Sequence, residues 1–373
     1  MRETQRLPID PVRLALVIAL ALLVHSGEPN PTQLSFWLVF SVLLAISIRW
    51  SIGLGTILAL VAAAIALRLA WNAHLGSDVL KVTRVAIDRM EHGLNPYGYA
   101  YQSSNPPGAS FPYGPLALFV YLPFHNHEAL LELFTGFAVV AILAVQGRLI
   151  GLAIYAVAPV LVATATDGSN DTTLGLLILL TFVAARRSPI GAAFLLACAT
   201  AFKLSALAFA PGFMLWVGLR PALMFVAGSL IGWSPVLASW GIASYLESTR
   251  IANDLHDSTR WSFGVLINEL ADRRVLELDQ LRYVAGGLVA LVGLKFRRSM
   301  DGVILVGIVV YMVTLYGGNW GTYAYLGGIA PLICWRLDDW LGLASEPLLP
   351  RLRTLREKWR SASAAPTEHD AIA

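Results

Sequence analysis

Asp78 is the acidic residue whose position in the sequence best suits proton transfer. It follows Gly76 and Ser77, shortly after an apolar stretch that ends near residue 70. A carboxylate beside apolar surface can have a raised pKa and act as a general base. The same position suits a helix N-cap, because Ser77 or Asp78 would open a helix over 79–91. The sequence leaves both roles open for Asp78.

A single lysine, Lys203, interrupts the apolar stretch 198–209. A charge in such a stretch is costly unless it pairs or reaches water, so Lys203 is a candidate functional residue. The alternative is a side chain that only extends to the membrane surface. The helix expected over 79–91 also carries Arg84 on a basic face, which can either hold a phosphate or be solvated.

The sequence Asp-Gly-Ser-Asn-Asp at 167–171 predicts a tight polar turn between two apolar segments. Asp167, Asn170 and Asp171 place two carboxylates and an amide close together, a set that can bind sugar hydroxyls or a cation. Ordinary turn chemistry with a helix N-cap at Asp171 explains the same residues.

Five of the seven histidines lie in two long segments, about 71–127 and 240–282, and tyrosine, proline and asparagine residues cluster at 95–115 within the first of them. Long loops on a rigid scaffold often carry function, so we expect a site there. His125 and His127, in His-Asn-His-Glu, are of metal-ligand types. Their i, i+2 spacing suits neither a helix face nor a structural zinc site, so we predict no metal centre from them.

The elements that position these residues are expected to be membrane-spanning helices. Hydrophobic residues make up 57% of the chain and charged residues 14%, against about 25% charged in soluble domains. Apolar segments recur along the whole sequence and predict an all-α, polytopic bundle of about twelve spans. Those spans include 12–24, 34–48, 129–145 and 149–164. The net charge of +3 and the two cysteines argue against a nucleic-acid partner and a disulfide framework.

The basic residues predict the orientation of this bundle. With the N-terminus inside, the cytoplasmic breaks hold basic residues and the short external breaks hold none, as the positive-inside rule requires. Those basic residues are Arg49, Arg148, Arg186, Arg187, Arg220, Lys295, Arg297 and Arg298. We expect one integral membrane domain over 1–340, external loops at about 71–127 and 240–282, and a basic cytoplasmic tail at 341–373 with a disordered end. The apolar stretch 115–124 is too short to span and is expected to be re-entrant or to lie on the outer surface.

The order of these features resembles the GT-C membrane glycosyltransferases, most closely glycosyltransferase family 87. The resemblance rests on an acidic residue after an early span, Asn95-Pro96-Tyr97, Phe111-Pro112-Tyr113-Gly114-Pro115, the turn 167–171 and Lys203. It covers residues 76–211 well and 323–335 weakly. Two features differ from the family: Asp78 is followed by Val79-Leu80 rather than by a second acid, and Asp-Gly-Ser-Asn-Asp replaces a Gly-Gln-x-Asn-like turn.

The resemblance implies an inverting glycosyltransferase with its site on the outer face of the plasma membrane. The donor would be a polyprenyl-phosphate sugar, with mannose favoured and arabinofuranose next, and the acceptor a glycolipid or glycan of the cell envelope. Asp78 would be the catalytic base, with Lys203 binding the donor phosphate. No cofactor is expected, although a divalent metal is not excluded. The alternative is a transporter or flippase of a lipid-linked saccharide.

Side chains of the outer segments are expected to complete this site. Arg84 and Arg260 would help Lys203 to hold the phosphate. The expected substrate-binding residues are Asp167, Asn170, Asp171, Tyr97, Tyr113 and His127.

Overall fold

The computed structural model describes residues 54–71, 78–104, 107–255 and 261–342. Within these ranges every regular element is helical, and the only extended pairing is an isolated bridge between Tyr101 and Ala109. This confirms the all-α class. The spans expected near 12–24 and 34–48, Arg260 and the tail 343–373 lie outside the described residues.

The chain divides into two compact units. One consists of Met1–Leu67, Phe137–Pro159 and Ile333–Ala373, and the other of Arg68–Gly136 and Val160–Leu332. All the candidate site residues that the structure describes belong to the second unit. The expectation of a single domain over 1–340 remains a prediction.

In the first unit, the end of α17 (Tyr325–Trp340) packs closely on α7 (Leu149–Val157). A Cβ atom on Gly151 would lie 1.8 Å from the carbonyl oxygen of Cys334, so the two backbones meet where only glycine fits. The Asp338 carboxylate accepts hydrogen bonds from the N–H groups of Ile150 (3.1 Å) and Gly151 (3.0 Å). It thereby satisfies two donors in the first turn of α7.

The span expected over 149–164 is two helices rather than one, α7 and α8 (Pro159–Thr164). Pro159 has no N–H group to continue the helical ladder. The residue before it, Ala158, is extended, with φ −62° and ψ 122°, as steric contact with the proline ring favours.

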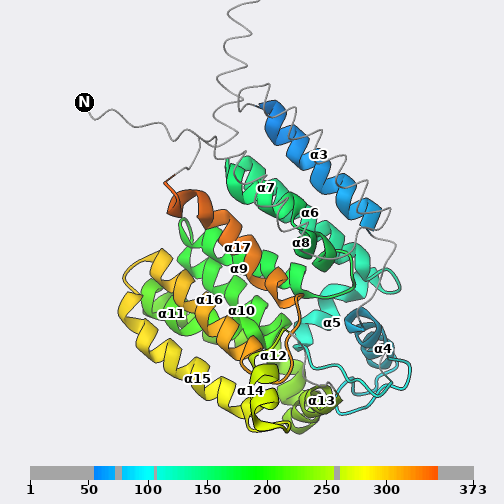
Figure 1. Ribbon diagram of the computed structural model, residues 1–373. Helices are drawn as coiled ribbons and strands as arrows, with labels where there is room; N and C mark the ends of the chain where they lie inside the picture. Colours follow the sequence, from blue (N-terminus) through cyan, green and yellow to red (C-terminus); the bar gives the residue numbers. More distant parts are fainter. Residues whose placement is uncertain (1–53, 72–77, 105–106, 256–260, 343–373) are drawn as a thin grey trace, which may run out of the picture. The chain divides into compact units, whose positions relative to one another are not determined.

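The second unit is built mainly from helices (Figure 1). α10 (Pro189–Phe202) packs against α9 (Asp171–Ala185) and α12 (Leu219–Pro235). α16 (Met300–Tyr316) packs against α15 (Leu278–Gly293) and the 3₁₀ helix η2 (Leu204–Phe209). The remaining apolar helices are α3 (Leu54–Trp71), α6 (Ala129–Val145) and α11 (Ala210–Val217). Most of α3 belongs to the first unit. Two short turns complete the set, the π-helical turn η3 (Val236–Trp240) and the 3₁₀ turn η4 (Leu294–Phe296).

The connecting segments carry shorter helices. These are α4 (Val79–Glu91), α5 (Pro115–Tyr121) with the 3₁₀ turn η1 (Leu122–Phe124), α13 (Ile242–Leu255) and α14 (Phe263–Ala271). α4 has the bounds that the sequence predicts. It ends because Gly93 adopts φ +70° and lets the N–H groups of Gly93 and Leu94 bond back to the last turn.

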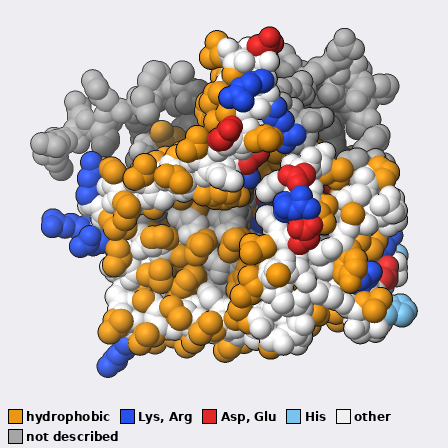
Figure 2. All heavy atoms as spheres, turned by 90° about the horizontal axis from the view of Figure 1, so that it is seen from below, with side chains coloured by type: hydrophobic (Ala, Val, Ile, Leu, Met, Phe, Trp, Pro, Cys, Tyr) orange, Lys and Arg blue, Asp and Glu red, His pale blue; other side chains and the backbone are white. Residues whose placement is uncertain are grey.

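One described helix, Leu219–Trp240, is long and apolar enough to cross a membrane. A second candidate arises if the stretch Pro115–Phe124 and α6, which meet at a 98° bend, count as one span. Only 17% of the apolar window in Leu219–Trp240 is buried. Figure 2 shows a face whose lower part is largely covered by hydrophobic side chains, while the charged side chains lie mainly above them and at the edges.

Candidate functional site

Lys203 is the centre of a buried polar cluster in the second unit. Its ammonium group donates hydrogen bonds to Asp171 Oδ1 (2.8 Å) and Asn170 Oδ1 (2.9 Å). The rings of Tyr113 and Tyr325 each have their centroid 5.3 Å from Lys203 Nζ, which is within range of a cation–π interaction. Only 11% of the Lys203 side chain and 2% of the Asp171 side chain are exposed. Lys203 therefore does not simply extend to a surface.

The end of α10 directs this lysine toward α9. Lys203 is the first residue after α10 and has extended backbone angles, φ −148° and ψ 122°. Since α9 and α10 are packed together, the lysine reaches the residues that open α9. Asn170 occupies the N-cap position but makes no capping hydrogen bond, because its side-chain oxygen accepts from Lys203. The expected N-cap at Asp171 is thus displaced by one residue.

The turn 167–171 is held rigidly. Asp167 Oδ1 accepts from the Ser169 N–H (2.8 Å), and Asp167 Oδ2 accepts from the Tyr323 hydroxyl (2.7 Å). Burial raises the pKa of Asp167 above its ordinary value, although these hydrogen bonds oppose the rise. Asp167 therefore shapes the turn through its own bonds, while Asn170 and Asp171 contact the lysine.

Asp78 lies at the start of α4, next to the same turn. The Leu80 N–H donates to the Gly168 carbonyl (3.2 Å), which joins the first turn of α4 to residues 167–171. Asp78 occupies the N-cap position with φ −77° and ψ −17°, and its side chain makes no capping hydrogen bond. The Asp78 carboxylate therefore does not perform the capping role that the sequence allowed.

Tyr113 connects the carboxylate of Asp78 with the lysine cluster. Burial raises the pKa of the Tyr113 phenol well above its ordinary value, and the nearby carboxylates of Asp78 and Asp171 raise it further. A phenol in these surroundings stays protonated and can donate a hydrogen bond. The Gly114 N–H donates to the Phe202 carbonyl (3.0 Å), which ties the Tyr113 segment to the end of α10 beside Lys203.

Three other predicted residues lie elsewhere or have other roles. Tyr97 is fully buried against Phe111, Trp240 and Tyr245. Its hydroxyl donates to the Tyr113 carbonyl (3.0 Å), so Tyr97 stabilises the position of the Tyr113 segment.

Arg84 and His127 are also outside the lysine cluster. The Arg84 guanidinium forms a bidentate ion pair with Glu128, with N···O distances of 2.5 and 3.0 Å. This pairing gives Arg84 a partner within the chain. The His127 side chain is exposed, in the turn that follows η1.

Two residues of the site have no counterpart in the sequence predictions. Tyr325 reaches Lys203 because α9 and the start of α17 approach closely: a Cβ on Gly175 would lie 2.2 Å from the Gly327 carbonyl oxygen. The other residue is Glu132, a fully buried carboxylate in the apolar helix α6. An isolated acid in so apolar a segment was itself a signal of function.

Glu132 joins α6, α5 and α9. It accepts hydrogen bonds from the Tyr121 hydroxyl (2.5 Å), the Thr173 hydroxyl (2.5 Å) and the Thr173 N–H (3.1 Å). Since Thr173 follows Asp171 by two residues, this network fixes the beginning of α9. Glu132 thereby positions the Asp171–Lys203 pair.

We expect Glu132→Ala to lower the stability of the protein strongly, because three buried donors lose their acceptor and each costs about 1–3 kcal/mol. Glu132→Gln should cost less, since its carbonyl oxygen still accepts. Thermal unfolding of the purified variants, compared with the exposed-site control Glu277→Ala, measures this order. Equal melting temperatures for Glu132→Ala and the control would contradict the positioning role.

Comparison with models of known protein families, with characterised proteins and with solved structures yields no match to this chain. The resemblance to glycosyltransferase family 87 accordingly remains a prediction from the residues quoted above.

Proposed function

We propose that the protein is a membrane-embedded inverting glycosyltransferase that uses a polyprenyl-phosphate sugar as donor. The observation that carries this proposal is the cluster around Lys203, in which a cation, two tyrosine rings and the carboxylates of Asp78 and Asp171 lie together. Such a cluster offers both a base for an acceptor hydroxyl and a cation for a leaving phosphate.

In the proposed reaction, Asp78 takes the proton from an acceptor hydroxyl as that oxygen attacks the anomeric carbon of the donor. The bond between the anomeric carbon and the phosphate oxygen breaks, and the polyprenyl phosphate leaves with the electron pair. Lys203 uses two of its N–H donors on Asn170 and Asp171. Its third N–H can bind the phosphate, whose charge increases in the transition state.

Two buried polar atoms at the start of α9 support substrate binding there. Asn170 Nδ2 and Thr172 Oγ1 are buried and have no hydrogen-bond partner. Buried polar groups are almost always paired, so groups left without a partner beside a candidate site require an explanation. Sugar hydroxyls both donate and accept, so they suit this amide and this hydroxyl.

We further propose that the chain forms a bundle of about twelve spans with both termini in the cytoplasm. The low burial of Leu219–Trp240 supports this arrangement, since an apolar helix at the core of a soluble protein would be mostly covered. Exposed apolar side chains on α12 and α15, such as Ile231 and Leu291, support it as well. The donor would enter from the lipid, because its polyprenyl tail stays in the bilayer.

The test is transfer of radiolabelled mannose, and then arabinofuranose, from synthetic polyprenyl phosphate to membrane glycolipids by the purified protein. Mannose is tried first because the resemblance favours it. A transporter of lipid-linked saccharide would instead move the labelled lipid across proteoliposomes without forming a new glycosidic bond. Movement without transfer would replace the proposal by that alternative.

We expect a cysteine at Ser103 to react with a membrane-impermeant thiol reagent in intact cells, and one at Ser188 to react only after lysis. Both positions are exposed. The background carries Cys198→Ala and Cys334→Ala, which removes both native thiols. The opposite labelling pattern would place Asp78 in the cytoplasm and contradict the proposed use of a donor on the outer face.

A further inference from the structure

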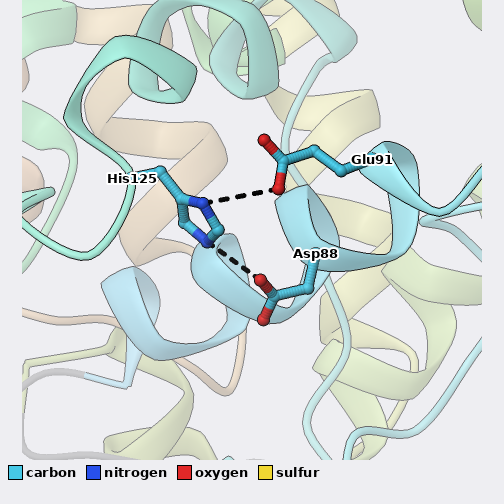
Figure 3. Close-up of side chains that lie close together, drawn as sticks. All are labelled: Asp88, Glu91 and His125. Carbon is cyan, nitrogen blue, oxygen red and sulfur yellow. Dashed lines mark ion pairs between the residues drawn. The ribbon is translucent and has the colours of Figure 1, made fainter.

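Asp88, Glu91 and His125 form a second cluster of chemically active side chains (Figure 3). His125 Nε2 lies 2.9 Å from Asp88 Oδ1, and His125 Nδ1 lies 3.5 Å from Glu91 Oε2. We propose that these three side chains form a divalent-metal site, with Zn²⁺ as its best-suited ion. The sequence predicted no metal at His125 from its spacing to His127, whereas the partners in this cluster come from a helix more than thirty residues earlier.

The ligand types and their placement fit a zinc site. Asp88 and Glu91 are spaced i, i+3 on α4, so they project from one face of the helix. One ligand atom from each of the three residues lies within 4.8 Å of the others. One imidazole and two carboxylates are ligands that Zn²⁺ accepts at about 2.0–2.2 Å, with water completing a tetrahedron.

A neighbouring ion pair holds the two sides of this cluster together. Arg84 lies one turn before Asp88 on α4. Two nitrogens of its guanidinium group donate hydrogen bonds to the carboxylate of Glu128, which is buried. Glu128 Oε1 also accepts from the Asn126 N–H (2.9 Å), and Asn126 adopts φ +67°. Burial raises the pKa of Glu128, but the bonds from Arg84 and Asn126 outweigh this and leave the pKa below its ordinary value. The turn that carries His125 is thus fixed against α4 independently of any metal.

The ring of His125 leaves one nitrogen available to a bound ion. Its Nε2 atom is buried and makes no hydrogen bond, although a carboxylate oxygen of Asp88 lies 2.9 Å away. Two ligands about 2.0–2.1 Å from a tetrahedral Zn²⁺ are roughly 3.3 Å apart, so Nε2 and the Asp88 oxygen need to separate only slightly to hold an ion between them. Glu91, which is 45% exposed on its side chain, can turn its carboxylate from Nδ1 toward Nε2 to complete the set.

The proposed metal would tie α4 to the turn after η1. Asp88 follows Asp78 by ten residues, which is about 15 Å along the helix, so the metal site is separate from the lysine cluster. The inference does not rest on the glycosyltransferase proposal. Its expected consequence is a more stable outer segment when the ion is bound.

The experiment is calorimetric titration of the purified, tag-free, full-length protein with Zn²⁺. We compare wild type with His125→Ala, with Asp88→Asn/Glu91→Gln, and with the matched control His127→Ala. His127 is exposed, lies in the same turn and is not one of the three ligands. We expect one site in wild type and the control. The affinity of this site for Zn²⁺ should fall in His125→Ala and in Asp88→Asn/Glu91→Gln. The fall should be at least the roughly 10–100-fold that is typical of losing an outer-shell partner of a metal.

A second readout is the shift of the melting temperature on adding Zn²⁺. Wild type and His127→Ala should gain stability, and His125→Ala should not. The polar double variant keeps both side-chain sizes, so it retains the fold even if His125→Ala does not. Absence of Zn²⁺ binding by wild type would overturn the proposal, since the cluster would then be an ion-pair network only. Equal Zn²⁺ affinity in wild type and the double variant would overturn it too.

Discussion

Asp78→Asn is expected to lower the rate of sugar transfer by roughly 10²–10⁴-fold, the usual contribution of a general base. The amide has nearly the same shape as the carboxylate but cannot accept the acceptor's proton. The fold should survive, because the Asp78 side chain makes no capping hydrogen bond on α4 and asparagine is itself a good N-cap residue. The measurement is transfer from radiolabelled donor at equal protein concentration.

Three comparisons make the Asp78 result specific. Asp78→Glu should recover little activity, because the added methylene moves the carboxylate by about 1 Å and reaction geometry is demanding. The control Asp254→Asn removes an exposed carboxylate whose ion-pair partner among the described residues is Arg250, and it should leave transfer unchanged. Donor binding should persist in Asp78→Asn. Wild-type transfer by Asp78→Asn would make Asp78 structural and direct the search for the base to the turn 167–171.

The second large effect concerns the buried pair between Lys203 and Asp171. Lys203→Met leaves the Asp171 carboxylate, 2% exposed, without its cation. Removing one partner of a buried pair typically costs about 3–5 kcal/mol. We therefore expect Lys203→Met to lose both its thermal stability and its sugar transfer, so this variant alone cannot separate a structural role from a catalytic one.

The double variant Lys203→Met/Asp171→Asn separates the two roles. It removes both charges, and replacing a whole buried pair is often neutral for stability. We expect its melting temperature to return toward wild type while transfer stays near background, since no cation remains to stabilise the phosphate. Lys203→Arg keeps the charge with a different geometry and should retain partial activity. Full transfer by a stable double variant would remove Lys203 from the reaction.

Much of the local structure could be predicted from the sequence. α6 has the bounds 129–145 and α4 the bounds 79–91 that the apolar pattern and the stop at Gly93 predict. The break before Pro159 was missed, although proline chemistry alone accounts for it. These features depend on residues only a few positions apart, which is why the sequence determines them.

The sequence also identified residues that must have special surroundings. Lys203 and Asp78 stood out because a charge beside apolar residues is costly. The same argument applied to Glu132 in α6 and would have found it. What the sequence determined was therefore the need for a partner, not the partner itself.

Only the tertiary structure determined which charged side chains pair with each other. Lys203 could reach water, lipid headgroups or another residue, and the packing of α9 on α10 brings it to Asp171, 32 positions earlier. Arg84 was a candidate for phosphate and instead meets Glu128, 44 positions later. His125 meets Asp88 and Glu91 of α4 by the same kind of contact. Ion pairs act over a few ångströms, so they are fixed by which helix faces meet, and that depends on the packing of the whole unit rather than on local sequence.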